Sequence, residues 1–119
     1  MGINLDQLDE ATKKKIQDLN NLSRNLEILN QQNLQIENSM SEASLAIEEL
    51  EKAESDTVVY KNIGGIMVKS ERNKLLDEKK SLKITLEMRS KTLAQNINRT
   101  KNNFETLQAS LKNDLGQIN

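Results

Sequence analysis

The stretch Thr57-Val-Val-Tyr-Lys-Asn-Ile-Gly-Gly-Ile-Met-Val-Lys69 decides the fold of this chain of 119 residues. Its β-branched and aromatic residues favour strands, and they lie on both sides of the Gly64-Gly65 pair. Adjacent glycines tolerate the positive φ angles that a two-residue hairpin turn requires. We therefore predict one β-hairpin over residues 57–69, at the centre of a chain that is otherwise helical.

Both faces of this hairpin carry apolar side chains, because side chains alternate between the two faces of a strand. One face holds Val59, Lys61, Ile63, Ile66 and Val68, and the other holds Val58, Tyr60, Asn62, Met67 and Lys69. An isolated hairpin is marginally stable in water, and its strands leave edges with unpaired backbone groups. The hairpin is therefore either a tight loop whose valines pack only on the helix ends, or one of several hairpins pooled into a shared β-barrel. We favour the barrel and assign its assembly to Val58, Val59, Tyr60, Ile63, Ile66, Met67 and Val68.

Apolar residues repeat in alternating steps of three and four through residues 4–54, which is the spacing of a heptad coiled coil. This spacing predicts one long helix with Asn4 as its N-cap and Gln7 reaching back to it. The line of residues that faces the partner helix, here called the seam, consists of Leu5, Leu8, Thr12, Lys15, Leu19, Leu22, Leu26, Leu29, Asn33, Ile36, Met40, Ala43, Ile47 and Leu50.

Residues 70–116 form a second predicted helix, with Ser70 as its N-cap. Its predicted seam consists of Leu75, Lys79, Leu82, Leu86, Arg89, Leu93, Ile97, Thr100, Phe104, Leu107 and Leu111. Two steps of four follow one another at Leu93, and they predict a stutter, a point where the supercoil locally unwinds.

The two predicted helices are expected to pair antiparallel, because the short hairpin turns the chain back on itself. Leu19 then faces Phe104, and Asn33 lies beside Ser90. The predicted fold is mainly α: a long antiparallel two-helix coiled coil with one central β-hairpin.

The distribution of charge favours the same pairing. Residues 1–56 carry 12 acidic and 5 basic side chains, whereas residues 57–119 carry 6 acidic and 12 basic ones. Opposite charges beside a seam set the orientation of the helices, so the acidic end of the first helix is expected beside the basic start of the second. The alternative interpretation is that the uneven distribution of charge arose by neutral drift on solvent-exposed surfaces.

The composition argues against catalysis. The chain has no histidine and no cysteine, so it lacks the commonest general base, the commonest metal ligand and any thiol nucleophile. Its short basic runs lack the interleaved aromatics that bind single-stranded nucleic acid. No apolar run approaches the length of a membrane span, and no signal peptide opens the sequence. We expect a cytoplasmic protein, not an enzyme, with no cofactor, metal, nucleic acid or membrane partner, that works by holding other proteins.

The ends of the two predicted helices form the candidate binding tips. In an antiparallel pair the two termini meet, so apolar residues from both ends of the chain gather far from the hairpin. The candidate client-binding residues are Ile3, Leu5, Leu8, Leu111, Leu115 and Ile118. Exposed apolar groups at a fraying end suit the binding of unfolded proteins. For Leu8 and Leu111, ordinary packing within the seam is the favoured alternative.

The segment Val58-Val-Tyr-Lys-Asn-Ile-Gly-Gly-Ile-Met-Val-Lys69, set between two long heptad helices, resembles the β-type subunits of prefoldin, a jellyfish-shaped co-chaperone. The pattern Val-Tyr-Lys, then Gly, then Ile-x-Val-Lys carries the resemblance, which is strongest to the archaeal β subunit and the eukaryotic subunit six. It covers the whole chain as one prefoldin-like domain, residues 1–119. α-type subunits have two hairpins, and the connection here has room for one. The sequence departs from the family in having Ile63-Gly64-Gly65 in place of a more polar turn.

The resemblance implies a hexamer of two α-type and four β-type subunits, with a double β-barrel body and six protruding helical tentacles. It also implies ATP-independent holding of unfolded proteins at the tentacle tips and their transfer to a group II chaperonin. The alternative is a structural or tethering coiled coil with no client-holding activity. The hairpin distinguishes these two functions and favours the chaperone subunit, because a spacer rod does not need a β-rich interruption with exposed edges.

Overall fold

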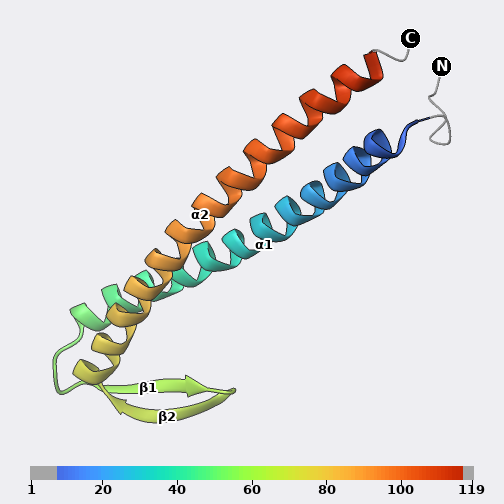
Figure 1. The fold of residues 1–119 in the computed structure, drawn as a ribbon. Coiled ribbons are helices and arrows are strands. Elements are labelled where there is room, and N and C mark those ends of the chain that lie inside the picture. The colour runs from blue at the N-terminus through green and yellow to red at the C-terminus, as the bar shows by residue number, and fades with distance from the viewer. Residues whose placement is uncertain (1–7, 117–119) are drawn as a thin grey trace. The chain divides into compact units, whose positions relative to one another are not determined.

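The structure, a computed structural model, describes residues 8–116 and contains two long helices joined by one antiparallel hairpin (Figure 1). The elements, in order, are α1 (Glu10–Lys52), β1 (Val58–Ile63), β2 (Ile66–Glu71) and α2 (Arg72–Gly116). This mainly helical architecture confirms the predicted fold class. Within the described range, neither helix is long and apolar enough to cross a membrane.

The chain divides into two compact units, and each contains a segment of both helices. The terminal unit comprises the chain up to Gln32 together with the chain from Leu93 onward. The hairpin unit comprises Asn33–Thr92 and holds both strands.

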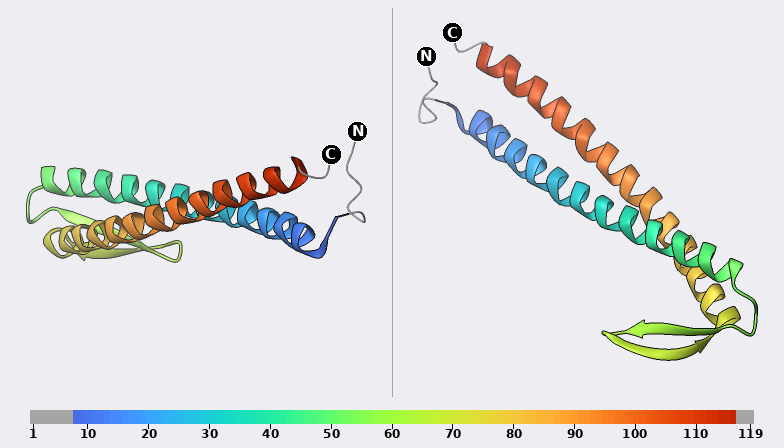
Figure 2. Two further views of the ribbon diagram at one scale, coloured as in Figure 1. Left: turned by 45° about the horizontal axis from the view of Figure 1, so that its top comes forward. Right: turned by 180° about the vertical axis from the view of Figure 1, so that it is seen from behind.

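In the terminal unit, the start of α1 runs antiparallel to the end of α2, as the views of Figure 2 show. α1 begins at Glu10, not at residue 4 as predicted. The reason is the cap: Asp9 accepts a hydrogen bond of 2.7 Å from the backbone amide of Thr12, which satisfies one of the free amides of the first turn. The predicted cap at Asn4 lies outside the described residues.

The predicted seam of α1 is confirmed. Every predicted seam residue from Thr12 to Leu50 is buried or half-buried, including the polar Lys15 and Asn33. The heptad spacing therefore located the inward face of α1 along the whole described helix.

The predicted seam of α2 is wrong at two positions in its first half and is confirmed at the others. Leu82 and Arg89 are exposed, whereas their neighbours Lys83 and Ser90 are half-buried. The buried and half-buried residues follow alternating steps of three and four without a break: Leu76, Lys79, Lys83, Leu86, Ser90, Leu93 and Ile97. The predicted stutter at Leu93 is therefore absent, because Lys83 and Ser90 take the inward positions in place of their neighbours Leu82 and Arg89.

The hairpin has the predicted two-glycine turn, and the structure gives its register. Ile63 pairs with Ile66 across a loop of two glycines, and the pairing continues to Val58 opposite Glu71. Both glycines have positive φ, 55° at Gly64 and 85° at Gly65, as a type I′ turn requires. The amide of Gly65 also donates to the side-chain oxygen of Asn62, at 3.1 Å.

The strand β2 continues directly into α2. It extends to Glu71, and α2 begins at the next residue, Arg72. Ser70, the predicted N-cap, is therefore a strand residue paired with Val59. The predicted hairpin over residues 57–69 is correct in type and is longer than expected on this side.

Candidate functional site

The hairpin presents apolar side chains to solvent on both of its faces. Six of the seven predicted assembly residues are exposed, with between 44% and 67% of their surface accessible: Val58, Tyr60, Ile63, Ile66, Met67 and Val68. A single soluble chain does not normally leave so many large apolar groups together in water. The hairpin is therefore the strongest candidate in this chain for a protein-binding surface.

The hairpin rests on the helices along β1 only. Val59 is half-buried and packs against the core cluster formed by Leu50, Leu75 and Leu76. On β2, every residue except Ser70 is exposed. The outer edge of β2 is therefore free to pair with another strand.

A groove of about 530 Å³ lies between β1 and the two helices. Its apolar lining comes from both sides and includes Ala46, Leu50, Tyr60, Met67 and Leu75. Because side chains from both strands line it, this groove extends the apolar surface of the hairpin toward the helices.

Arg72 ties the start of α2 to the end of α1. Its guanidinium donates to two backbone carbonyl oxygens in the last turn of α1, those of Leu50 at 2.7 Å and Glu51 at 3.2 Å. These carbonyls have no partner within the helix, and the positive charge suits the negative end of the helix dipole. The charge pattern predicts the basic start of α2 beside the end of α1, but it does not indicate these acceptors, because they are backbone atoms.

The predicted meeting of acidic and basic residues is confirmed in part. Lys80 on α2 pairs with Glu51 on α1 at 3.5 Å. Glu48 and Glu49 instead pair with Lys52 in their own helix, at 3.4 and 3.7 Å.

A second ion pair links the hairpin to α2. The ammonium of Lys61 on β1 donates to a carboxylate oxygen of Glu78 on α2 at 2.8 Å. This hydrogen bond is the main cause that lowers the pKa of the Glu78 carboxyl below its ordinary value. The pair joins residues 17 positions apart, so no helical spacing could have indicated it.

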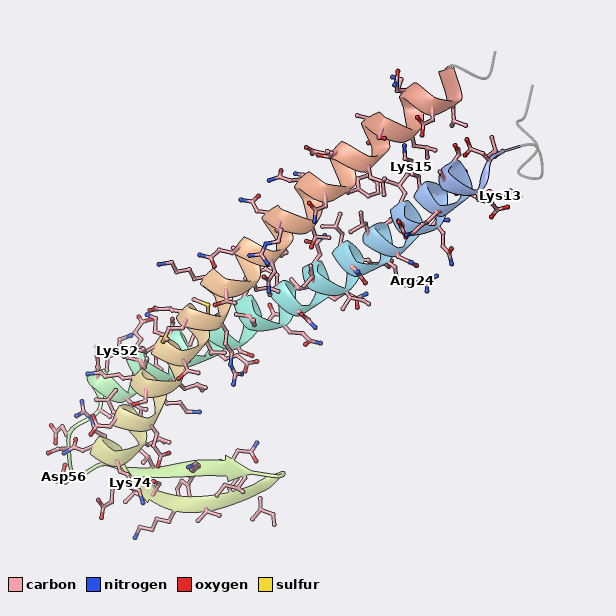
Figure 3. The ribbon with its side chains drawn as sticks, in the orientation of Figure 1. Lys13, Lys15, Arg24, Lys52, Asp56 and Lys74 are labelled. Atoms are coloured by element: carbon pink, nitrogen blue, oxygen red, sulfur yellow. The ribbon has the colours of Figure 1, made fainter. Side chains whose placement is uncertain are left out.

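The ends of the two helices are packed together in the terminal unit. Leu8 is 6% exposed and Leu111 is 8% exposed, and Leu115 is half-buried. Lys15 points from α1 toward the end of α2 (Figure 3), where it donates to Ser110 at 2.9 Å and pairs with Asp114. The other predicted tip residues, Ile3, Leu5 and Ile118, lie outside the described residues.

Residues 8–116 present few ionisable groups with perturbed chemistry. No group of three or more acidic side chains in this range is placed to hold a metal ion. The two carboxyls with a shifted pKa, Asp9 and Glu78, have structural partners: hydrogen bonds from Thr12 lower the first, and Lys61 lowers the second. What the chain presents instead is apolar surface and an unpaired strand edge.

Comparison with known proteins agrees with this description. The prefoldin subunit family, Prefoldin_2, matches residues 13–118. The prefoldin subunit beta of Methanothrix thermoacetophila is 36% identical over 112 residues, covering 94% of this chain and 93% of that protein. The prefoldin subunit beta of Pyrococcus furiosus is 35% identical, with 79% and 84% covered. The crystal structure of the prefoldin beta subunit from Thermococcus strain KS-1 superposes with a TM-score of 0.78 at 25% identity, covering 90% of this chain and 94% of that one.

Two long helices joined by a single exposed hairpin, together with these similarities, define a subunit of a co-chaperone. The chain belongs to the prefoldin family, and within that family it is a β-type subunit. Its general role is therefore that of a co-chaperone subunit, and membership implies assembly with other prefoldin subunits.

Proposed function

We propose that this chain is one of four β-type subunits that assemble with two α-type subunits into a cytoplasmic hexamer. The hexamer holds unfolded proteins without ATP and passes them to a group II chaperonin. Hairpins from all subunits pool into a β-barrel body, and the helix ends hold the client protein.

The exposed hairpin carries this proposal. Its large apolar side chains point to both faces, and only Val59 packs against the core of its own chain. Pairing of the free β2 edge with a neighbouring hairpin would satisfy its backbone groups, and a barrel would cover the apolar faces. Burial of these faces contributes roughly 25 cal/mol for each Å² of apolar surface removed from water.

Client holding is assigned to the helix ends, where the candidate residues are Ile3, Leu5, Leu115 and Ile118. Leu8 and Leu111 are packed between the helices, so a client reaches them only when the helix ends separate. Each set of ends offers a small apolar surface and binds weakly by itself. Several arms that contact one client together raise the affinity through their effective concentration.

A tethering coiled coil without client holding is the competing function. Such a rod gains nothing from the exposed hairpin, which lowers solubility unless a partner covers it. A tether would also leave the aggregation of unfolded proteins unchanged.

The test is co-expression with an α-type prefoldin subunit, followed by measurement of the native mass. We expect a complex of two α-type and four β-type chains. The purified complex should suppress the light scattering of a chemically denatured protein diluted into buffer without ATP. A complex that assembles and does not suppress scattering would favour the tether, and the absence of any complex would contradict the proposed assembly.

A further inference from the structure

Two contacts attach the hairpin to the helices, and both come from the same face of β1. Val59 packs on the leucine cluster, and Lys61, two residues later, pairs with Glu78. Residues two apart on a strand point the same way, so both side chains reach toward the helices. β2 adds only the half-buried Ser70.

The Lys61–Glu78 pair is a weak source of stability. The two side chains remain 40% and 38% exposed, and ion pairs that solvent reaches contribute little to folding because water screens them. A short charge-assisted hydrogen bond of 2.8 Å is, however, demanding in its geometry. The apolar contact at Val59 has no such directional requirement, so by itself it fixes the angle of the hairpin less closely.

The neighbourhood of Glu78 indicates what the pair prevents. Leu82 follows Glu78 by four residues, so it lies on the same side of α2, and it is exposed. The next residue of β1 on the face of Lys61 is Ile63, which is also exposed. An apolar residue at position 78 would let this face of β1 settle on α2 and cover Ile63 with Leu82. With the polar pair in place, Ile63 and Leu82 both stay exposed, and this face of the hairpin stays open.

We propose that the Lys61–Glu78 ion pair positions the hairpin for assembly, by holding it at the angle at which its β2 edge and open faces meet the hairpins of neighbouring subunits. The inference rests on the proposed assembly through hairpins. Lys61 and Glu78 are positioning residues, and the partner they prepare for is another hairpin of the same kind, from a second copy of this chain or from an α-type subunit.

The test uses reversal of charge. Lys61→Glu, Glu78→Lys and the double exchange are each co-expressed with an α-type subunit. Native mass gives the fraction of complex, and far-UV circular dichroism gives the melting temperature of the isolated chain. We expect each single reversal to lower the fraction of complex at least fivefold with little change in the melting temperature, and the double exchange to restore that fraction.

Lys80→Glu is the matched control. It introduces the same change of charge and breaks the Lys80–Glu51 pair, which joins α2 to α1 without contacting the hairpin. It should assemble like the wild type. Equal impairment by Lys80→Glu, normal assembly of Lys61→Glu, or failure of the double exchange to restore assembly would each overturn the inference while the wild-type complex still forms. A wild-type chain that does not assemble would overturn the proposed function, and the inference with it.

Discussion

The Nε atom of Arg72, the first residue of α2, donates a hydrogen bond of 2.7 Å to the carbonyl oxygen of Leu50, in the last turn of α1. Leu50 also belongs to the buried cluster on which Val59 packs. Leu50 of α1 therefore contacts the first residue of α2 through its carbonyl oxygen, and it belongs to the cluster on which the start of the hairpin packs. A hydrogen bond to a backbone carbonyl and apolar packing therefore hold the base of the hairpin against α1, and the exposed part of the hairpin extends away from this base.

Proline at Val68 is expected to prevent assembly and to leave the helices intact. Val68 pairs with Lys61, two positions from the turn-closing pair of Ile63 and Ile66. Since hydrogen-bonded pairs alternate along an antiparallel ladder, the amide of Val68 points toward β1. Its loss removes a ladder bond worth about 1 kcal/mol. Native mass should show no hexamer, and far-UV circular dichroism should show nearly unchanged helicity.

Met67→Pro tests the outer edge of β2 without disturbing the hydrogen bonds inside the hairpin. Met67 pairs with Asn62 at the intervening position, so its amide points to the free side of β2. This variant should keep the internal ladder and still assemble poorly, because it removes a donor from the edge. An intact hexamer from both proline variants would be incompatible with assembly through shared strands.

Asn33→Leu is expected to stabilise the chain by about 1 kcal/mol, because a half-buried seam position would gain an apolar side chain. The amide of Asn33 donates only to Glu37 of its own helix, at 3.3 Å, so little is lost with it. The substitution should also loosen the register or the choice of oligomer, which a polar seam residue restricts.

Thermal unfolding and native mass measure these two effects. Asn38→Leu is the control, since Asn38 is exposed on the same helix and should leave the melting temperature unchanged. If Asn33→Leu melts at a temperature no higher than that of the control, the assignment of Asn33 to the seam is wrong.

Acid should weaken the start of α1. Hydrogen bonds from the hydroxyl and then the amide of Thr12 hold the pKa of Asp9 below its ordinary value of 3.8. A carboxyl with a lowered folded-state pKa stabilises the fold at pH values above its unfolded-state pKa, and this contribution is lost as the pH falls through the lowered value. The amide resonance of Thr12 in NMR spectra should shift in this range. In Asp9→Asn the shift should be absent; a shift that persists would come from another carboxyl.

Removal of the chain ends is expected to separate client holding from assembly. Deletion of residues 1–5 together with residues 115–119 removes the proposed client-binding residues and leaves Leu8 and Leu111 in place. The truncated chain should form a complex of normal composition with nearly normal helicity. It should lose most of its suppression of aggregation, because the apolar contacts and the avidity built on them are gone.

A full-length variant with serine at Ile3, Leu5, Leu115 and Ile118 is the control for chain length. It should lose suppression as the truncated chain does, in a light-scattering assay at matched complex concentration. Full suppression by either variant would place the client elsewhere on the complex.

The sequence predicted the elements of the fold well, because they depend on local patterns. The glycine pair located the turn, and the heptad spacing located the inward face of α1. The inward face of α2 was misassigned at Leu82 and Arg89, because both assignments ignored the phase set by the buried residues Leu76, Leu86 and Leu93.

The contacts that position the hairpin could not be predicted in the same way. The carbonyl acceptors of Arg72 exist at the end of any helix, so their use leaves no mark in the residue pattern. The pairing of Lys61 with Glu78 depends on the angle between a strand and a helix, which no residue spacing encodes. The assignment of the tip residues rests on their place in the chain alone and stays a prediction.

The absence of a linker between β2 and α2 makes the two connections of the hairpin unequal. Residues 53–57 separate α1 from β1, whereas Glu71 is followed at once by Arg72. Extra residues should therefore be tolerated after α1 and should be harmful at the junction of β2 with α2, where one insertion turns every later side chain of the helix by about 100°. Natural length variation and engineered reporter peptides alike are best accommodated before β1.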